Sequence, residues 1–298
     1  MRAAIADFAA RWHAMPPIAG LSAALDAMAA PEADEVAALL GPVIEEVDWV
    51  GALICALIAE LRRDPAFDPP FAPLRSDVQA GLMLYTGRHA AIGLGVGALD
   101  RLAAKKRLTG TGSIVFPGHA TLIRVLDGGG ATVSLWRGGW HGGAAMERCA
   151  PLGRHVLRDG EMLAIDRGTS FLVEHARRDM LLLHATIFAG AAPAACEYDH
   201  ATLALTGTGA TSDQASRTQM LVGLLSAIGR DDAAAFEAAS RAPERFVRWH
   251  AMREWLAFDA DAAALRLVEI AETDPDAELR ALATETIALI AEPIACHS

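Results

Sequence analysis

The stretch "RDGEMLAIDRGTSFLVEH", residues 158–175, contains two short apolar runs joined by a polar turn. Its halves "GEMLAI" and "SFLVEH" favour β-strands, and the intervening "DRG" is typical of a turn. A third run, "MLLLHATIFA" at 180–189, follows the polar residues "ARRD". We therefore predict three consecutive strands. We also expect His175 and His184, which flank the "ARRD" turn, to lie on neighbouring strands.

Two further pairs of strand-like runs precede this stretch. "GLMLY" and "HAAIGLGV" flank a turn at 86–88, whereas "ATLIRVL" and "ATVSLW" flank the "DGGG" turn at 127–130. Glycines supply the positive φ angles that tight turns need, so we predict two β-hairpins. Many short strands between residues 74 and 200 indicate a β-sandwich or barrel.

The spacing of the opening stretch carries a family resemblance. Read from Gly160 through Gly168, it is G-x5-D-x-G-x2-F-x3-H. This resembles the second conserved motif of the cupin family, G-x5-P-x-G-x2-H-x3-N. Cupins are small double-sheet β-barrels, and many of them hold a metal. The resemblance, over about 112–188, implies an α+β protein built around a cupin-like jelly-roll barrel at 74–200.

The metal ligands that the resemblance implies are largely missing. Phe171 stands at the family's metal-binding histidine. In the region of the first motif, His119 is present, Thr121 holds the partner position, and no glutamate follows before the "GGG" of the turn. Catalytic metal sites commonly use three protein ligands. We therefore expect a barrel without a metal cofactor.

Strand geometry adds further residues to the candidate pocket. Alternate residues of a strand face the same side, so an inward Phe171 places Val173 and His175 inward too. The alternative to a metal-free barrel is a rearranged site. There His119, His175 and His184 would hold Fe or another divalent first-row metal. The simpler interpretation is that these histidines are satisfied core or rim residues.

The glycine-rich segment "SLWRGGWHGG" at 134–143 is a candidate lid. It could cover the barrel mouth and stack tryptophans on a planar ligand. The alternative is a glycine turn that leaves a strand, with Trp136 in the core. The candidate ligand-binding residues are therefore His119, Thr121, Trp136, Trp140, His141, Phe171, Val173, His175 and His184.

Helical segments flank the predicted barrel. Residues 1–63 are alanine-rich with helical periodicity, and four prolines at 64–73 end them. Residues 211–298 are helical again, and "DPDAELR" at 274–280 resembles the turn of HEAT repeats. Isolated repeat units cannot bury their apolar faces. We therefore expect these helices to pack on the rest of the chain or on another copy.

The composition limits which classes of partner and which cellular compartment we expect. The net charge of −11 disfavours nucleic acid, because phosphates repel an acidic protein. The longest apolar run, 50–59, is too short to cross a membrane, and the N-terminus does not resemble a signal peptide. We expect a cytoplasmic protein. "GLGVG" at 93–97 does not complete a dinucleotide-binding motif, so we assign it no cofactor.

The sequence favours a binding function. We expect an accessory or sensor protein that holds a small ligand in a degenerate barrel and binds a protein partner through its helices. The resemblance also allows a homodimer, since many cupins pair through their sheets. The alternative is a cupin-type metal-dependent oxygenase or isomerase with a rearranged histidine site. Whether the chain is an enzyme stays open at this point.

Overall fold

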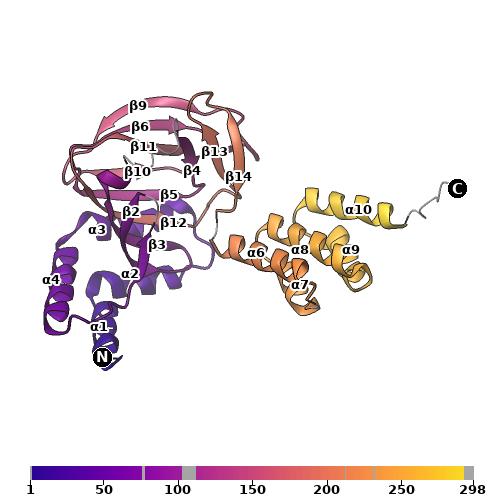
Figure 1. Ribbon diagram of the computed structural model, residues 1–298, viewed down its shortest axis with the longest axis horizontal. Helices are drawn as coiled ribbons and strands as arrows, with labels where there is room; N and C mark the ends of the chain where they lie inside the picture. The colour runs from indigo at the N-terminus through magenta and orange to yellow at the C-terminus, as the bar shows by residue number, and fades with distance from the viewer. Residues whose placement is uncertain (1, 76–77, 103–111, 212, 231, 292–298) are drawn as a thin grey trace. The chain divides into compact units, whose positions relative to one another are not determined.

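The described residues form an α+β fold, which confirms the class predicted from the sequence. The computed structural model describes residues 2–75, 78–102, 112–211, 213–230 and 232–291. Spatial contacts divide the chain into two compact units, Met1–Thr211 and Ser212–Ser298. In the first unit, helices lie beneath stacked antiparallel sheets (Figure 1). A jelly-roll barrel, the finer prediction, stays a prediction.

Helices occupy the start of the first unit, as the alanine-rich segment predicts. They are α1 (Arg2–His13), α2 (Pro16–Asp26), α3 (Ala33–Glu45) and α4 (Asp48–Arg63). The last turn of α4 carries Arg62 and Arg63. Cations in that position are stabilised by the helix dipole. The proline-rich segment then follows, where missing backbone N–H groups prevent the helix from continuing.

The strands of the first unit are short and antiparallel. They are β1 (Ala72–Arg75), β2 (Gln79–Thr86), β3 (Ala90–Gly97), β4 (Ser113–Phe116), β5 (Ala120–Asp127), β6 (Thr132–Arg137), β7 (Trp140–His141), β8 (Ala144–Ala145), β9 (Ala150–Val156), β10 (Met162–Ile165), β11 (Thr169–His175), β12 (Met180–Ile187), β13 (Ala195–Asp199) and β14 (Leu205–Gly209). A six-stranded sheet has the order β1-β2-β3-β12-β5-β10. Two three-stranded sheets have the orders β11-β6-β9 and β14-β13-β4, and β7 pairs with β8.

One of the two predicted hairpins is confirmed and the other is wrong. β2 and β3 pair as a hairpin. β5 instead pairs with β10 and β12, so neither of its edges remains for β6. The "DGGG" turn does adopt positive φ at Gly129 and Gly130. It carries the chain from the six-stranded sheet into the three-stranded sheet of β6.

The three strands of the opening stretch are present, but they alternate between sheets. β10 and β12 belong to the six-stranded sheet, whereas β11 pairs with β6. His175 on β11 and His184 on β12 are therefore not on neighbouring strands, contrary to expectation. The turn after β10 is held by the Asp166 carboxylate, which accepts the backbone N–H of Gly168 at 2.9 Å.

The six-stranded sheet has two differently covered faces. On β12, Leu183, Ala185 and Ile187 are buried in one core with side chains of α1–α4. Residues of the opposite face, such as Met180 and Ile123, share a second core with Val133 of β6. The sheet thus lies between the N-terminal helices and the β11-β6-β9 sheet (Figure 1).

The second unit is helical and has a core of its own. It contains α6 (Asp213–Ala227), α7 (Ala233–Ala239), α8 (Arg245–Phe258), α9 (Ala260–Thr273) and α10 (Ala277–Ala291). Phe236, Met252 and Trp255 are buried among these helices. Trp255 is therefore buried in the core of the helical unit itself. The expected packing of these helices on the rest of the chain or on another copy stays a prediction.

The "DPDAELR" segment forms the turn between α9 and α10. The Asp276 carboxylate accepts the backbone N–H groups of Glu278 and Leu279, which caps α10. Asp274 makes a bidentate ion pair with the guanidinium of Arg248 on α8, at 2.8 and 2.9 Å, and both side chains are buried. The turn is as predicted, and a HEAT-like stacking of the helices stays a prediction.

A membrane-spanning helix is not found among the described residues: none of their helices combines the necessary length and apolarity.

Candidate ligand pocket

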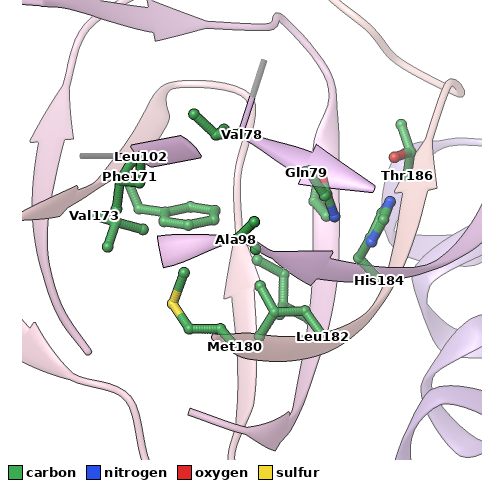
Figure 2. A pocket seen from close by; sticks show the side chains of 13 residues that line it. Val78, Gln79, Ala98, Leu102, Phe171, Val173, Met180, Leu182, His184 and Thr186 are labelled. Carbon is green, nitrogen blue, oxygen red and sulfur yellow. The ribbon is translucent and has the colours of Figure 1, made fainter. Parts of the chain in front are cut away.

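A cavity of about 260 Å³ lies on the inner face of the six-stranded sheet (Figure 2). Its walls come from both the six-stranded sheet and the β11-β6-β9 sheet. The lining residues are Val78, Gln79, Gly97, Ala98, Leu102, Thr121, Ile123, Phe171, Val173, Met180, Leu182, His184 and Thr186.

Strand alternation explains which side chains reach the cavity. On β12 the apolar run "MLLLHATI" sends alternate residues to opposite faces. Leu183 and Ala185 pack toward the helices, whereas Leu182, His184 and Thr186 line the cavity. A continuous apolar run is therefore required, because this strand is covered on both faces.

Glycines on β3 make room for the side chains that line the cavity. A Cβ placed on Gly93 would stand 2.7 Å from Cε1 and Nε2 of His184. One on Gly95 would overlap the side-chain nitrogen of Gln79, and one on Gly97 would stand 2.8 Å from Cε of Met180. The alternating glycines of "GLGVG" thus let three neighbouring side chains lie flat against β3.

The cavity has one polar end. Gln79, His184 and Thr186 lie together at one end in Figure 2, while Phe171, Val173 and Met180 lie at the other. Thr121 belongs to the polar end, because it is the register partner of Thr186 between β5 and β12. Within the described residues, the imidazole of His184 and the hydroxyls of the two threonines have no hydrogen-bond partner.

The electrostatics of the cavity are those of a neutral site. Burial lowers the pKa of His184 below its ordinary value, because the imidazolium would lose its hydration. His184 is therefore neutral at pH 7, so one ring nitrogen can donate a hydrogen bond and the other can accept one. The described lining residues include no aspartate, glutamate, lysine or arginine.

Four of the nine residues predicted for the site meet in this cavity. They are Thr121, Phe171, Val173 and His184. The remaining five, His119, Trp136, Trp140, His141 and His175, are not among its lining residues.

His119 lies just before β5, in a different environment. Its imidazole is half-buried, with Nδ1 3.4 Å from the carbonyl oxygen of Pro117 and the ring centroid 6.3 Å from that of Phe188. Burial lowers its pKa as well. These contacts are those of a packed rim residue rather than of a ligand in the cavity.

His175 does not face inward, contrary to the expectation from strand parity. The register of β11 against β6 shifts between Val173 and His175, which is a β-bulge. The extra residue reverses the alternation, and the side chain of His175 is exposed. The inward orientation expected from strand alternation is observed for Phe171 and Val173, but not for His175, which follows the bulge.

The segment proposed as a lid is divided between two environments. Trp136 is 8% exposed and packs in a core with Phe116 and Tyr198, its Nε1 donating to Ser134 Oγ at 3.0 Å. Trp136 therefore lies in the core, as the alternative to a lid predicts. Trp140 packs against the edge of the same core and, with His141, lines a separate surface hollow of about 580 Å³. The two tryptophans therefore do not form one stacking lid over the cavity.

The alternative metal site is not assembled by the fold. Within the described parts of the chain, no group of three or more His, Cys, Asp or Glu side chains is placed to hold a metal ion. His175 is exposed on β11, whereas His184 lines the cavity from β12. The side chains of His119, His175 and His184 therefore do not converge on one position where a metal could bind.

Several lining residues escaped the sequence analysis. Leu182 and Thr186 share the parity of His184 on a single strand, so the pattern of "MLLLHATI" contained the signal for them. Gln79 reaches the cavity from β2, which is brought there only by its pairing with β3. Local sequence gives no sign of that placement.

Several solved structures of other proteins are similar to part of this chain. No protein-family model matches the chain, and no curated protein matches its sequence. A hydroquinone 1,2-dioxygenase, PnpCD, overlaps 35% of this chain and 61% of its own, with 15% identity and a TM-score of 0.25. An ectoine synthase from P. lautus overlaps 39% of this chain and 67% of its own, with 12% identity and a TM-score of 0.23.

The EutQ protein of Clostridium difficile overlaps 40% of this chain and 68% of its own, with 16% identity and a TM-score of 0.22. This chain thus spans less than two thirds of the dioxygenase chain that it matches. Overlaps of this extent carry no argument about activity.

Proposed function

We propose that this protein binds a small molecule in the cavity between its sheets and acts as an accessory or sensor protein. On this proposal the sheets are a degenerate cupin-like jelly-roll barrel that works without a metal. One observation carries the proposal: a cavity with an apolar body and a single polar end, whose His184 and threonines have no hydrogen-bond partner among the described residues. Concave, mostly apolar sites with a few polar groups are typical of ligand binding.

The cavity volume limits the ligand. A protein cavity of about 150 Å³ can hold benzene. In proportion, the 260 Å³ available here has room for a ligand of roughly ten non-hydrogen atoms. Larger molecules would have to extend beyond the described lining residues.

A cupin-type oxygenase or isomerase remains the alternative. It would need three ligands that converge on one metal, and His184 is the one histidine among the described lining residues. The geometry therefore supports the binding function better.

A protein partner on the helical unit stays a prediction. Met220, Leu224 and Ile228 recur at helical spacing along α6 and beyond its end, and they are 74%, 54% and 60% exposed. Exposed apolar patches of this kind are typical of contact surfaces.

The ligand-binding proposal is tested by filling the cavity. Ligand-observed NMR of the full chain with a mixture of small aromatic and alicyclic molecules should detect binding. Leu182→Trp should abolish it, because the indole would occupy the cavity. The matched control is Leu152→Trp, since Leu152 is 50% exposed on β9.

Circular dichroism checks that each variant folds, and Val173→Phe is the second blocking variant. Binding signals that survive in both folded blocking variants would place the small molecules outside the cavity and overturn the proposal.

A further inference from the structure

The structure points to an uncharged ligand with a hydrogen-bonding group at one end: we propose that the cavity selects a neutral aromatic or alicyclic amide, ketone or alcohol. This inference rests on the proposed ligand binding and specifies its chemistry. The polar end, the lack of charged side chains in the described lining and the apolar wall all favour such a ligand.

The polar end can both donate and accept hydrogen bonds. Thr121 and Thr186 are register partners across the β5–β12 pair and both line the cavity, and His184 precedes Thr186 by two residues on the same face of β12. Each threonine hydroxyl donates once and can accept, and a neutral imidazole does both. An amide, carbonyl or hydroxyl group satisfies such a surface.

The lack of charged side chains among the described lining residues disfavours ionised ligands. An ion that enters a buried site loses its hydration, and only a counter-charge or several strong hydrogen bonds can offset that loss. The described lining residues supply no charged side chain. His184 does not become a counter-charge readily, because its burial disfavours the imidazolium. A carboxylate or ammonium group is therefore disfavoured in this cavity.

The other end of the cavity suits a ring. Phe171, Met180 and Leu182 form its wall together with Ile123. Aromatic rings pack favourably against other rings and against the sulfur of methionine. The glycines of β3 preserve this space. They let His184, Gln79 and Met180 lie against the sheet instead of projecting across the cavity.

Three probe molecules of similar size separate the contributions of the ring, the hydrogen-bonding group and the charge to binding. Benzamide is neutral and has a hydrogen-bonding group, benzoate carries the same ring with an ionised carboxylate at pH 7, and toluene has the ring alone. We expect benzamide to bind the full chain at least tenfold more tightly than benzoate by NMR titration. We also expect benzamide to bind more tightly than toluene.

Two substitutions remove one hydroxyl each with little change in shape. Thr121→Val and Thr186→Val should each weaken benzamide binding by roughly 3- to 10-fold, the loss expected for one neutral hydrogen bond. Toluene binding should stay the same in both. The matched control is Thr208→Val, because Thr208 is exposed on β14.

The outcomes distinguish this inference from the function on which it rests. If toluene binds as tightly as benzamide and neither threonine matters, or if benzoate binds as tightly as benzamide, the neutral polar class is wrong. Cavity binding itself then stands, provided that Leu182→Trp abolishes it. If none of the probes binds, or if binding persists when the cavity is filled, both the proposed function and this inference are overturned.

Discussion

Gly93 of β3 and His184 of β12 are register partners, and the imidazole lies where a side chain at position 93 would begin. A Cβ on Gly93 would be 2.7 Å from two ring atoms of His184, closer than van der Waals contact allows. The orientation of the imidazole therefore depends on the glycine across the strand pair.

Gly93→Ala should destabilise the protein by about 1–3 kcal/mol, the usual cost of overpacking a core. Gly51→Ala is the matched control. Gly51 lies within α4 and nothing stands within 4 Å of its would-be Cβ. Alanine there should stabilise by about 0.5–1 kcal/mol, because glycine disfavours helix interiors. Urea unfolding measures both changes. Equal effects of the two substitutions would contradict the packing of His184 on Gly93.

Phe171→Ala should be less damaging than removal of a fully enclosed phenylalanine. Phe171 lines the cavity, so one side of its ring already lacks packing partners, and we expect a loss toward or below the low end of about 3–5 kcal/mol. Phe116 is 0% exposed and packs edge-on against Tyr198 at 5.2 Å, so Phe116→Ala should cost the upper part of that range. A neutral effect of Phe171→Ala would mean that its ring points to solvent.

Phe171→His should not create a tight metal site. The substitution gives the cavity two histidines, and its Thr121 does not replace a third strong ligand for a first-row metal. Titration of the wild type and of Phe171→His with Fe, Mn, Ni, Cu and Zn, followed by elemental analysis, should give less than one bound equivalent. One tight equivalent in the wild type that is lost in His184→Ala would favour the enzymatic alternative.

Stability should fall as the pH drops below about 6.5, in part through His184. Its pKa is lowered in the folded state by burial, so below the unfolded pKa of about 6.5 the unfolded chain binds a proton that the folded chain does not. The free energy of unfolding therefore decreases toward acid in this window, above the range where carboxylates titrate.

His184→Gln should flatten that dependence below about pH 6.5, as measured by urea unfolding. His119, whose pKa burial also lowers, should contribute with the same sign. His141→Gln is the control, because this side chain is exposed. An unchanged slope in His184→Gln would show that its imidazole is not buried.

The fragment 1–211 should fold without the helical unit. Its sheets and α1–α4 share a continuous core, and Trp255 and Met252 are covered within the second unit. We expect the fragment to unfold cooperatively with a melting temperature close to that of the first unit in the full chain. Aggregation, or a large fall in that temperature, would mean that the helices stabilise the sheets.

Much of the candidate site follows from local sequence. Strands have a side-chain period of two whatever their partners, so the runs around Phe171 and His184 already determine which residues share a face. The family resemblance pointed to Thr121 and Phe171, and alternation along the strand added Val173; these three residues and His184 line the cavity. Glycines likewise mark the turns, because few other residues adopt positive φ.

Tertiary structure alone decided which strand edges pair and where alternation breaks. The pairing of β5 with β10 and β12 leaves no edge for β6, and the bulge after Val173 turns His175 outward. Gln79 reaches the cavity only because β2 pairs with β3. Backbone hydrogen bonds between strands are nearly independent of side-chain identity, so the choice among edges depends on burying all apolar faces at once. That condition involves the whole chain, and no short stretch of sequence contains it.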